Sequence, residues 1–401
     1  MNKQEAKEII LDMMEFLDNG ECEFDGIVYR GHPGFYHFHS KEEMLVKLNE
    51  YLHKETYDNY DIYYIANKLI KFLLSKYDSH TKVNFINYSM MPMQLKLVDS
   101  KIFIEKMSEK LENLIGGEII SLNGVKADTL MNEIEEITCY STKEYLFTDI
   151  EQSIITPSIL KSLPSIDNNT ETFDYEIEIN GLIKHLNFNE KDLFGYKFNP
   201  QKQNYKYKIF EDVMVLTYSQ CKDFEKMKEF INIISKVAED KIISKFVVDI
   251  RDNYGGNSSV IYPLLNFLEG KELVTLVNEK TFSSASMAFV DLENMGSHSI
   301  GTCISTSLNC FGNNTIRKTY ENLGLTISAS SKYFYYDKNL ECISLTGKEE
   351  FEKFICGREE LLEPFILYPD EIVNITVNDL KNGTDSQLEA ALNYLNNKKK
   401  L

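Results

Sequence analysis

Apolar residues recur at three- and four-residue spacing through the first part of this 401-residue chain. The spacing predicts three helices, at Lys3–Leu17, Lys41–Leu52 and Tyr60–Lys76, because one face of a helix repeats about every 3.6 residues. Ser40, followed three residues later by Glu43, has the pattern of a capping box at the start of the second helix. Residues 1–82 are therefore predicted to form an N-terminal helical domain.

The pattern changes to short alternating runs between about Lys82 and Tyr205, of which Tyr175–Ile179 is an example. Alternation of apolar and polar residues is typical of strands that bury one face. The polar stretch Asn199–Asn204 then marks a boundary. We therefore expect a β-rich middle region over residues 83–205.

Strands and helices alternate from Ile209 onward. Apolar, β-branched runs predict strands at Val213–Thr217, Phe246–Ile250 and Leu273–Val277. Amphipathic segments predict helices at Glu225–Val237, Ser258–Leu268 and Ser284–Asn294. This alternation indicates βαβ units, so the predicted fold class is α/β for this region and α+β for the whole chain. The α/β core is expected to span residues 206–380, followed by a C-terminal helical tail over residues 381–401, with its helix at Ser386–Asn397.

Two loops of this core carry candidate chemistry. One follows Phe246–Ile250 and contains Gly255 and Gly256, where backbone N–H groups can point outward with no side chain in the way. The other contains Ser284 and two neighbouring serines ahead of a helix, where unpaired N–H groups and the helix dipole favour a developing anion. In a parallel sheet both loops lie at the edge where ligands bind. Taken singly, the serines are also common N-caps and the glycines a common tight turn.

Together these motifs resemble those of the tail-specific, or carboxyl-terminal processing, serine peptidases, which include the tricorn core peptidase. Asp249–Gly256 is similar to the family's strand motif D-[LI]-R-x-N-x-G-G, and Leu276–Ser286 to its nucleophile segment. Ser75–Thr81 resembles its D-[GS]-H-T motif, and Leu114–Val125 resembles a segment that often belongs to a PDZ-like module. The resemblance covers most of the chain. It implies a ClpP/crotonase-like βαβ catalytic core, a PDZ-like segment near 113–137, and peptidase activity on peptides or unfolded protein tails.

The resemblance also implies which residues perform the chemistry. It assigns the nucleophile to Ser284 and leaves the neighbouring serines as capping residues. Backbone N–H groups of Ala285 and of Gly255 or Gly256 would bind the oxyanion that forms when the serine attacks a carbonyl.

A serine nucleophile needs a base within hydrogen-bond reach and a group that orients the base. Many members of the family use a lysine downstream of the nucleophile, but the corresponding region Gly301–Cys310 contains none. The tricorn-like branch uses a histidine, a serine and a distant glutamate, and His80 and Ser79 are similar to the first two. Glu363 is the first candidate for the glutamate, in a split version of the family's late L-E-P-D-I segment, and Glu341 is the second.

The composition disfavours some classes of binding partner. The 62 acidic and 43 basic residues give a formal net charge of −19, which disfavours nucleic-acid and anionic-membrane surfaces. No apolar stretch is long enough to span a bilayer, and the N-terminus lacks the pattern of a signal peptide. Seven cysteines without a C-x-x-C spacing favour reduced thiols and a cytoplasmic protein. The expected partner is a peptide or protein substrate, and a homo-oligomer is left open.

The sequence indicates no cofactor and no metal site. His32, His37 and His39 lie close together, but no cysteine or carboxylate joins them at a metal-ligand spacing. Their alternation with aromatic residues favours an ordinary strand instead.

A second hypothesis for the function stays open. Met287 stands where the family has an acidic residue, and Ser305–Ser307 replaces a glycine-rich strip. These departures are also those expected of a catalytically degenerate, peptide-binding protein of the same fold.

Overall fold

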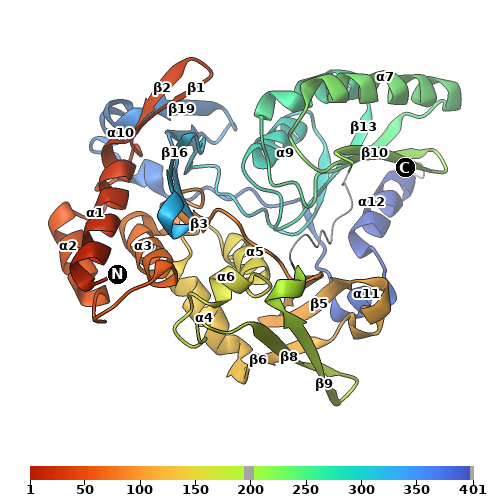
Figure 1. Cartoon of the computed structure of the whole chain (residues 1–401). Helices are drawn as coiled ribbons and strands as arrows, with labels where there is room; N and C mark the ends of the chain where they lie inside the picture. Colours follow the sequence, from red (N-terminus) through yellow and green to blue (C-terminus); the bar gives the residue numbers. More distant parts are fainter. Residues whose placement is uncertain (194–202, 398–401) are drawn as a thin grey trace. The chain divides into compact units, whose positions relative to one another are not determined.

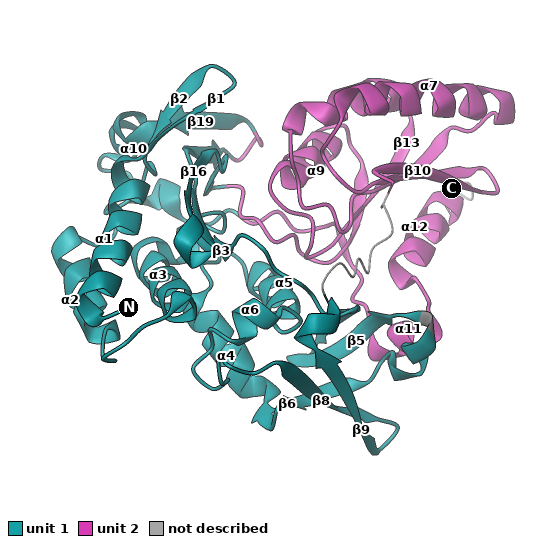
Figure 2. Ribbon diagram, in the orientation of Figure 1, with its two compact units in different colours: residues 1–198, 309–337, 341–365 teal, residues 199–308, 338–340, 366–401 magenta. Residues whose placement is uncertain are grey.

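The computed structural model describes residues 1–193 and 203–397 (Figure 1). The chain forms two compact units (Figure 2). Unit 1 comprises residues 1–198, 309–337 and 341–365, and unit 2 comprises residues 199–308, 338–340 and 366–401. Most of the boundary stretch Asn199–Asn204 lies outside the described residues. The four-part division drawn from the sequence stays a prediction. No helix within the described ranges is both long and apolar enough to cross a membrane.

Unit 2 is built on a six-stranded sheet in the order β10-β11-β12-β13-β14-β20. Neighbours from β11 to β20 pair in parallel, and β10 pairs antiparallel at one edge. The strands are β10 (Tyr205–Phe210), β11 (Val213–Tyr218), β12 (Lys245–Asp249), β13 (Glu272–Val277), β14 (His298–Gly301) and β20 (Glu371–Ile372). The three strands predicted from the sequence are confirmed, each with its ends displaced by no more than one residue.

Helices cover both faces of this sheet because its strands are apolar on both sides. Leu216 and Val248 belong to the core formed with α7, α8 and α9, whereas Val215 and Val247 pack with Leu395 and its neighbours on α12. In Figure 1, α12 lies on the face of the sheet opposite α7 and α9. The helices are α7 (Phe224–Lys241), α8 (Tyr262–Leu268), α9 (Ser284–Asn294), α11 (Val377–Asn382) and α12 (Ser386–Asn397). The helices predicted at Ser284–Asn294 and Ser386–Asn397 therefore have the expected bounds, and the predicted α/β class is confirmed.

Unit 1 begins with three helices that share one apolar core: α1 (Lys3–Asn19), α2 (Lys41–Tyr51) and α3 (Asn59–Leu74). Each starts with a capping box, in which Asn2, Ser40 or Asp58 accepts a backbone N–H from the third helical residue. The predicted helices and the predicted capping box at Ser40 are confirmed.

The remainder of unit 1 consists of small antiparallel sheets and short helices. The largest sheet contains β4 (Met93–Val98), β5 (Lys101–Met107), β6 (Glu118–Leu122), β7 (Val125–Lys126), β8 (Thr172–Ile179) and β9 (Leu182–Asn189). The smaller sheets contain β1 (Glu21–Phe24), β2 (Ile27–Arg30), β3 (Lys82–Phe85), β15 (Cys310–Gly312), β16 (Ile316–Tyr320), β17 (Leu325–Ala329), β18 (Lys332–Tyr336) and β19 (Cys342–Thr346). The helices are α4 (Ala127–Ile137), α5 (Lys143–Ser153), α6 (Pro157–Leu160) and α10 (Gly347–Ile355). The strand expected at Tyr175–Ile179 is part of β8, and the PDZ-like character of the β6–α4 segment stays a prediction.

Residues 309–337 and 341–365 lie in unit 1, although the sequence interpretation assigned them to the α/β core. The physical reason is strand pairing. β17 pairs antiparallel with β3, so that Leu325 lies opposite Phe85. Phe311 and Tyr333 pack with Phe351 in a further apolar cluster. The loop that follows α3 is thereby held by strands that come much later in the chain.

Candidate active site

Ser284 is the first residue of α9, close to the carboxyl end of β13. The preceding Ser283 has a φ of +57° and a ψ of −124°, a conformation that costs a residue with a side chain about 1–3 kcal/mol. The Ser283 N–H donates to the Thr306 hydroxyl at 3.0 Å, which helps to hold this turn. Ser284 itself is only 8% exposed. A strained turn therefore places one hydroxyl at the start of a helix.

The glycine pair that follows β12 lies beside this hydroxyl. Ser284 Oγ donates to the Gly256 carbonyl oxygen at 2.8 Å. Gly255 has a φ of +87°, and a Cβ there would lie 2.9 Å from Ser284 N and 2.8 Å from Phe282 O, so the site accepts only glycine without a shift of backbone. Because β12 and β13 are parallel, their loops emerge at the same edge of the sheet. The structure therefore brings Ser284 and the glycine pair together, as the sequence predicts.

Two of the N–H groups predicted to bind an oxyanion are engaged within unit 2. Ala285 N donates to Phe282 O at 3.1 Å, and Gly255 N donates to Asn253 Oδ1 at 3.0 Å. Asn253 is fully buried, and its amide also donates to the Tyr218 carbonyl at 2.8 Å. An oxyanion would have to compete with these acceptors. The assignment of an oxyanion hole stays a prediction.

Arg251, in the same loop, anchors the C-terminal helix to the sheet. Its guanidinium contacts both carboxylate oxygens of Asp249 at 2.8–2.9 Å and both of Asp385 at 2.7–2.8 Å. Forked pairs of this kind fix orientation as well as distance. The sequence interpretation missed Asp385, which lies just before α12 and far from Arg251 in the chain.

The predicted base His80, with Ser79 and the candidate glutamates, lies in unit 1. The loop that carries His80 runs from η1 (Ser75–Tyr77) to β3 and surrounds a buried carboxylate. Asp78 is fully buried. Its oxygens accept hydrogen bonds from His80 N at 2.6 Å, Thr81 N at 3.2 Å, Thr81 Oγ1 at 2.5 Å and Ser330 Oγ at 3.2 Å, and lie 2.9 Å from His32 Nε2. A carboxylate with so many partners fixes the loop that carries His80.

The imidazole of His80 is enclosed in this loop, with the residue 9% exposed. Imidazole Nδ1 lies 3.8 Å from Asp78 Oδ1, and the backbone carbonyl oxygen of His80 accepts a hydrogen bond from Asn314 Nδ2 at 3.2 Å. Burial lowers the pKa of His80 below its usual 6.5, against the opposing effect of the Asp78 charge. The neutral imidazole, which is the form able to accept a proton, therefore persists to lower pH than in an exposed histidine.

Asp78 also contributes to acid stability. Burial by itself would raise the pKa of Asp78, but the hydrogen bond from His32, together with His80 and Thr81, lowers it from 3.8 to about 2. A lowered carboxyl pKa means that the ionised group stabilises the fold above pH 3.8 and that this contribution is lost as the pH falls toward about 2.

Asp78→Asn is accordingly expected to lower the free energy of unfolding at neutral pH by about 2–3 kcal/mol, because the buried donors around this position lose a charged acceptor. Urea unfolding measures this loss. The difference from wild type should shrink between about pH 4 and about pH 2, where the wild-type carboxylate becomes protonated. Asp12→Asn, which breaks an exposed pair with Lys318, is the control and should change stability by less than about 1 kcal/mol. Equal losses in the two variants would contradict this account.

The two candidate glutamates have other neighbours in the structure. Glu363 is 65% exposed, and its carboxylate lies 3.1 Å from Lys76 Nζ. Glu341 is exposed, and its N–H donates to Asp337 Oδ1 at 2.9 Å. The role of either glutamate as the orienting group stays a prediction.

Ser79, predicted to help orient His80, has its hydroxyl next to a different residue. Ser79 Oγ accepts the Ser141 N–H at 3.2 Å. The orienting role of Ser79 also stays a prediction. Within unit 1, the carboxylate close to the imidazole of His80 is that of Asp78, which the motif contains but to which no role was assigned.

The prediction of a strand around His32 is wrong. Residues 31–39 form turns and bends, because Gly31 (φ +54°) and Tyr36 (φ +61°) occupy the left-handed region. His32 is buried, its Nδ1 accepts the Gly34 N–H at 3.1 Å, and its Nε2 is therefore the nitrogen that donates to Asp78. The G-H-P-G sequence carried the missed signal, since glycine and proline favour turns. In the described part of the chain, no group of three or more His, Cys, Asp or Glu side chains could hold a metal ion.

The predicted residues thus form two groups. Ser284, Ala285 and the glycine pair belong to unit 2, and His80, with Ser79 and Glu363, belongs to unit 1. Within each unit the local geometry is defined. A meeting of His80 with Ser284 stays a prediction.

Known proteins share this fold. No protein-family model matches the sequence, and no curated protein matches it as a relative. Among solved structures, mature CPAF is similar, with a TM-score of 0.64 and 11% identity over 100% of this chain and 97% of that chain. Mature CPAF complexed with lactacystin gives a TM-score of 0.62 and 11% identity over 99% and 98% of the two chains. A photosystem II D1 C-terminal processing protease gives 0.45 and 10% identity over 95% and 98%.

At such low identity the likeness shows the fold alone. Because it spans nearly the whole of both chains, the fold shared with CPAF includes the α/β sheet that carries Ser284. The predicted resemblance to carboxyl-terminal processing peptidases is therefore confirmed at the level of the fold.

Proposed function

We propose that this chain is a serine peptidase that hydrolyses peptide bonds in peptides or unfolded protein tails. One observation carries the proposal. Ser284 follows a strained residue at the start of α9, and its hydroxyl lies within hydrogen-bond distance of the glycine pair. Capping does not account for this arrangement, because the N-cap position belongs to Ser283, whose side chain makes no capping hydrogen bond.

In the proposed mechanism, Ser284 Oγ attacks the scissile carbonyl carbon while His80 takes its proton. Backbone N–H groups of Ala285 and of Gly255 or Gly256 stabilise the oxyanion. His80 then gives the proton to the leaving amine, and water hydrolyses the acyl-enzyme with His80 again as the base. The mechanism requires His80 Nε2 or Nδ1 to come within about 3 Å of Ser284 Oγ.

Orientation of the base is assigned to Ser79 with a glutamate, Glu363 first and Glu341 second. The local geometry supports a further contribution from Asp78, because its carboxylate fixes the backbone of the His80 loop. The cysteine pattern of the sequence supports a cytoplasmic location for this activity.

A covalent probe tests the proposal. A fluorophosphonate reacts only with an activated serine, and lactacystin is a second probe because CPAF has been solved in complex with it. We expect one fluorophosphonate adduct per chain, located at Ser284 by mass spectrometry of digested protein. An adduct at Ser283 or Ser286 would overturn the assignment of the nucleophile. Absence of any adduct in folded protein would favour the catalytically degenerate peptide-binding protein.

A further inference from the structure

The two backbone N–H groups ahead of Ser284 are bound by two different loops of unit 2. Phe282 N donates to the Asn253 carbonyl oxygen at 3.0 Å, in the loop that follows β12. Ser283 N donates to the Thr306 hydroxyl at 3.0 Å, in the segment that follows β14. The turn before the candidate nucleophile is thus held from both sides, at the residue where its backbone is strained.

The segment that carries Thr306 runs beside the loop between β13 and α9. Thr302 N donates to the carbonyl oxygen of the last residue of β13 at 3.2 Å, and Ser305 N donates to the Thr281 carbonyl oxygen at 3.3 Å. Between them, Ile304 is fully buried in the apolar core that also contains residues of α9. Backbone hydrogen bonds and this apolar side chain therefore fix the position of Thr306 without help from its own hydroxyl.

The Thr306 hydroxyl has a specific task at this position. Thr306 is 4% exposed, and the Ser283 N–H that it accepts is partly buried, so loss of the acceptor would leave a donor poorly satisfied. The φ of +57° and ψ of −124° at Ser283 are unfavourable for a residue with a Cβ. The hydrogen bond to Thr306 opposes relaxation of this turn, and the turn directs Ser284 Oγ at the Gly256 carbonyl oxygen.

We propose that Thr306 is a positioning residue for the nucleophile. The inference rests on the proposed peptidase function. The Thr306 hydroxyl holds Ser283 in its strained conformation, which sets the first turn of α9 and with it the direction of Ser284 Oγ. A small displacement of a reacting group can lower its rate of reaction strongly. The stretch Ser305–Ser307, which departs from the glycine-rich strip of the resembled family, then supports catalysis instead of marking its loss.

Thr306→Val tests this inference, because valine keeps the shape of threonine but cannot accept the Ser283 N–H. The maximal rate of fluorophosphonate labelling at Ser284 should fall about tenfold. The probe concentration that gives half the maximal rate should stay unchanged, since the hydroxyl is misdirected while the probe still binds. Thr306→Ser retains the acceptor and should label within about threefold of wild type. Labelling of Thr306→Val at the wild-type rate would overturn the inference.

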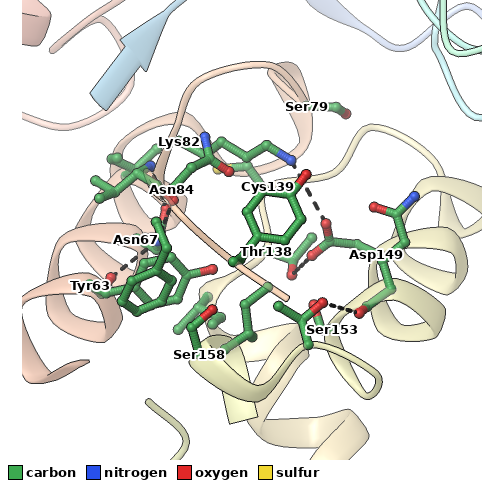
Figure 3. Close-up of a pocket in the computed structure, with 18 of the residues that line it drawn as sticks. Tyr63, Asn67, Ser79, Lys82, Asn84, Thr138, Cys139, Asp149, Ser153 and Ser158 are labelled. Carbon is green, nitrogen blue, oxygen red and sulfur yellow. Dashed lines mark hydrogen bonds and ion pairs between the residues drawn. The ribbon is translucent and has the colours of Figure 1, made fainter. Parts of the chain in front are cut away.

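Thr275→Val and Thr138→Val are matched controls that remove a buried threonine hydroxyl elsewhere. Thr275 lies in β13, and its hydroxyl is 2.7 Å from Ser297 Oγ. Thr138 lines a cavity of about 370 Å³ in unit 1 (Figure 3), and its hydroxyl donates to Asp149 Oδ2 at 2.7 Å. Neither hydroxyl contacts the turn at Ser283, so both controls should label at the wild-type rate. A loss in the controls equal to that in Thr306→Val would also overturn the inference.

Ser283→Gly distinguishes positioning from a general structural role of Thr306. Glycine adopts a positive φ without steric cost, so the turn then needs less support from the Thr306 hydroxyl. In the Ser283→Gly background, Thr306→Val should therefore lower the labelling rate by about threefold or less, against about tenfold in wild type. The same factor in both backgrounds would show that Thr306 does not act through Ser283 and would overturn the inference.

Hydrogen exchange at the Ser283 amide separates this inference from the peptidase function. In NMR spectra of protein with isotope-labelled serine, exchange should be faster in Thr306→Val and near that of wild type in Thr306→Ser, whether or not Ser284 reacts. Labelling of wild type, with exchange and labelling rate unchanged in Thr306→Val, would remove the positioning role alone. Faster exchange in Thr306→Val, in a chain that no fluorophosphonate labels, would leave the contact between Thr306 and Ser283 and remove the peptidase.

Discussion

Ser284→Ala should abolish hydrolysis of an unfolded protein substrate, with a loss of roughly 10⁴-fold or more. The variant lacks the hydroxyl that forms the acyl-enzyme, and no neighbouring group occupies the same place at the start of α9. Loss of the hydrogen bond from Ser284 Oγ to the Gly256 carbonyl should cost stability only about 1 kcal/mol. Cleavage of reduced, unfolded casein, followed by electrophoresis, measures the activity, and thermal unfolding measures the stability.

The neighbouring Ser286→Ala variant is the matched control. Ser286 is also a buried serine of α9, and its hydroxyl lies 3.4 Å from the Thr281 carbonyl oxygen. Its loss should leave the rate of hydrolysis near that of wild type. Activity that survives in Ser284→Ala and disappears in Ser286→Ala would show that the nucleophile is assigned to the wrong serine.

Much of unit 2 is predictable because the sequence patterns that define its helices and strands are local. The bounds of α9 and α12 follow from apolar periodicity and from the polar residues at their ends. The apolar runs of β11, β12 and β13 are those of strands buried on both faces. The contact between Ser284 and Gly256 then follows from parallel pairing, which brings the ends of β12 and β13 to one edge.

The surroundings of His80 are not predictable in the same way, because its partners are distant in the chain. The carboxylate of Asp78 accepts hydrogen bonds from His32 and from Ser330, and no local sequence pattern links these three residues. The pairing of β17 with β3 is equally non-local. Hydrophobic periodicity reports which face of an element is buried, but it does not report which element covers that face.

The same limit applies to the glutamate of the proposed mechanism. A motif can be matched by residue type, and Glu363 matches the late segment of the resembled family. Its environment in unit 1 is nevertheless an exposed ion pair with Lys76. Such pairs contribute little to stability, about 0–1 kcal/mol, so the contact with Lys76 does not commit Glu363 to a structural role.

His80→Ala should reduce hydrolysis by roughly 10³–10⁴-fold, because the proton of Ser284 then has no acceptor in the proposed mechanism. In wild type, kcat/KM should rise with pH and reach a plateau, since only the neutral imidazole acts as a base. Burial lowers the pKa of His80 from 6.5, so the midpoint of this rise should lie below pH 6.5. Rates measured from about pH 4.5 to about pH 8 give the profile.

The fall in the rate of hydrolysis at acid pH must be distinguished from acid unfolding. The pH ranges over which the buried His80 and Asp78 affect stability allow this distinction. A histidine with a lowered pKa reduces folding stability progressively as the pH falls below 6.5, because the unfolded chain then binds more protons. The loss expected from Asp78 begins only below pH 3.8. Unfolding curves recorded at each pH should therefore show folded protein at the midpoint of the rate profile. His185→Ala is the control, since His185 is an exposed histidine paired with Asp174, and its profile should match that of wild type. Substantial activity in His80→Ala, or a midpoint above pH 6.5, would exclude His80 as the base and leave the peptide-binding protein as the remaining hypothesis.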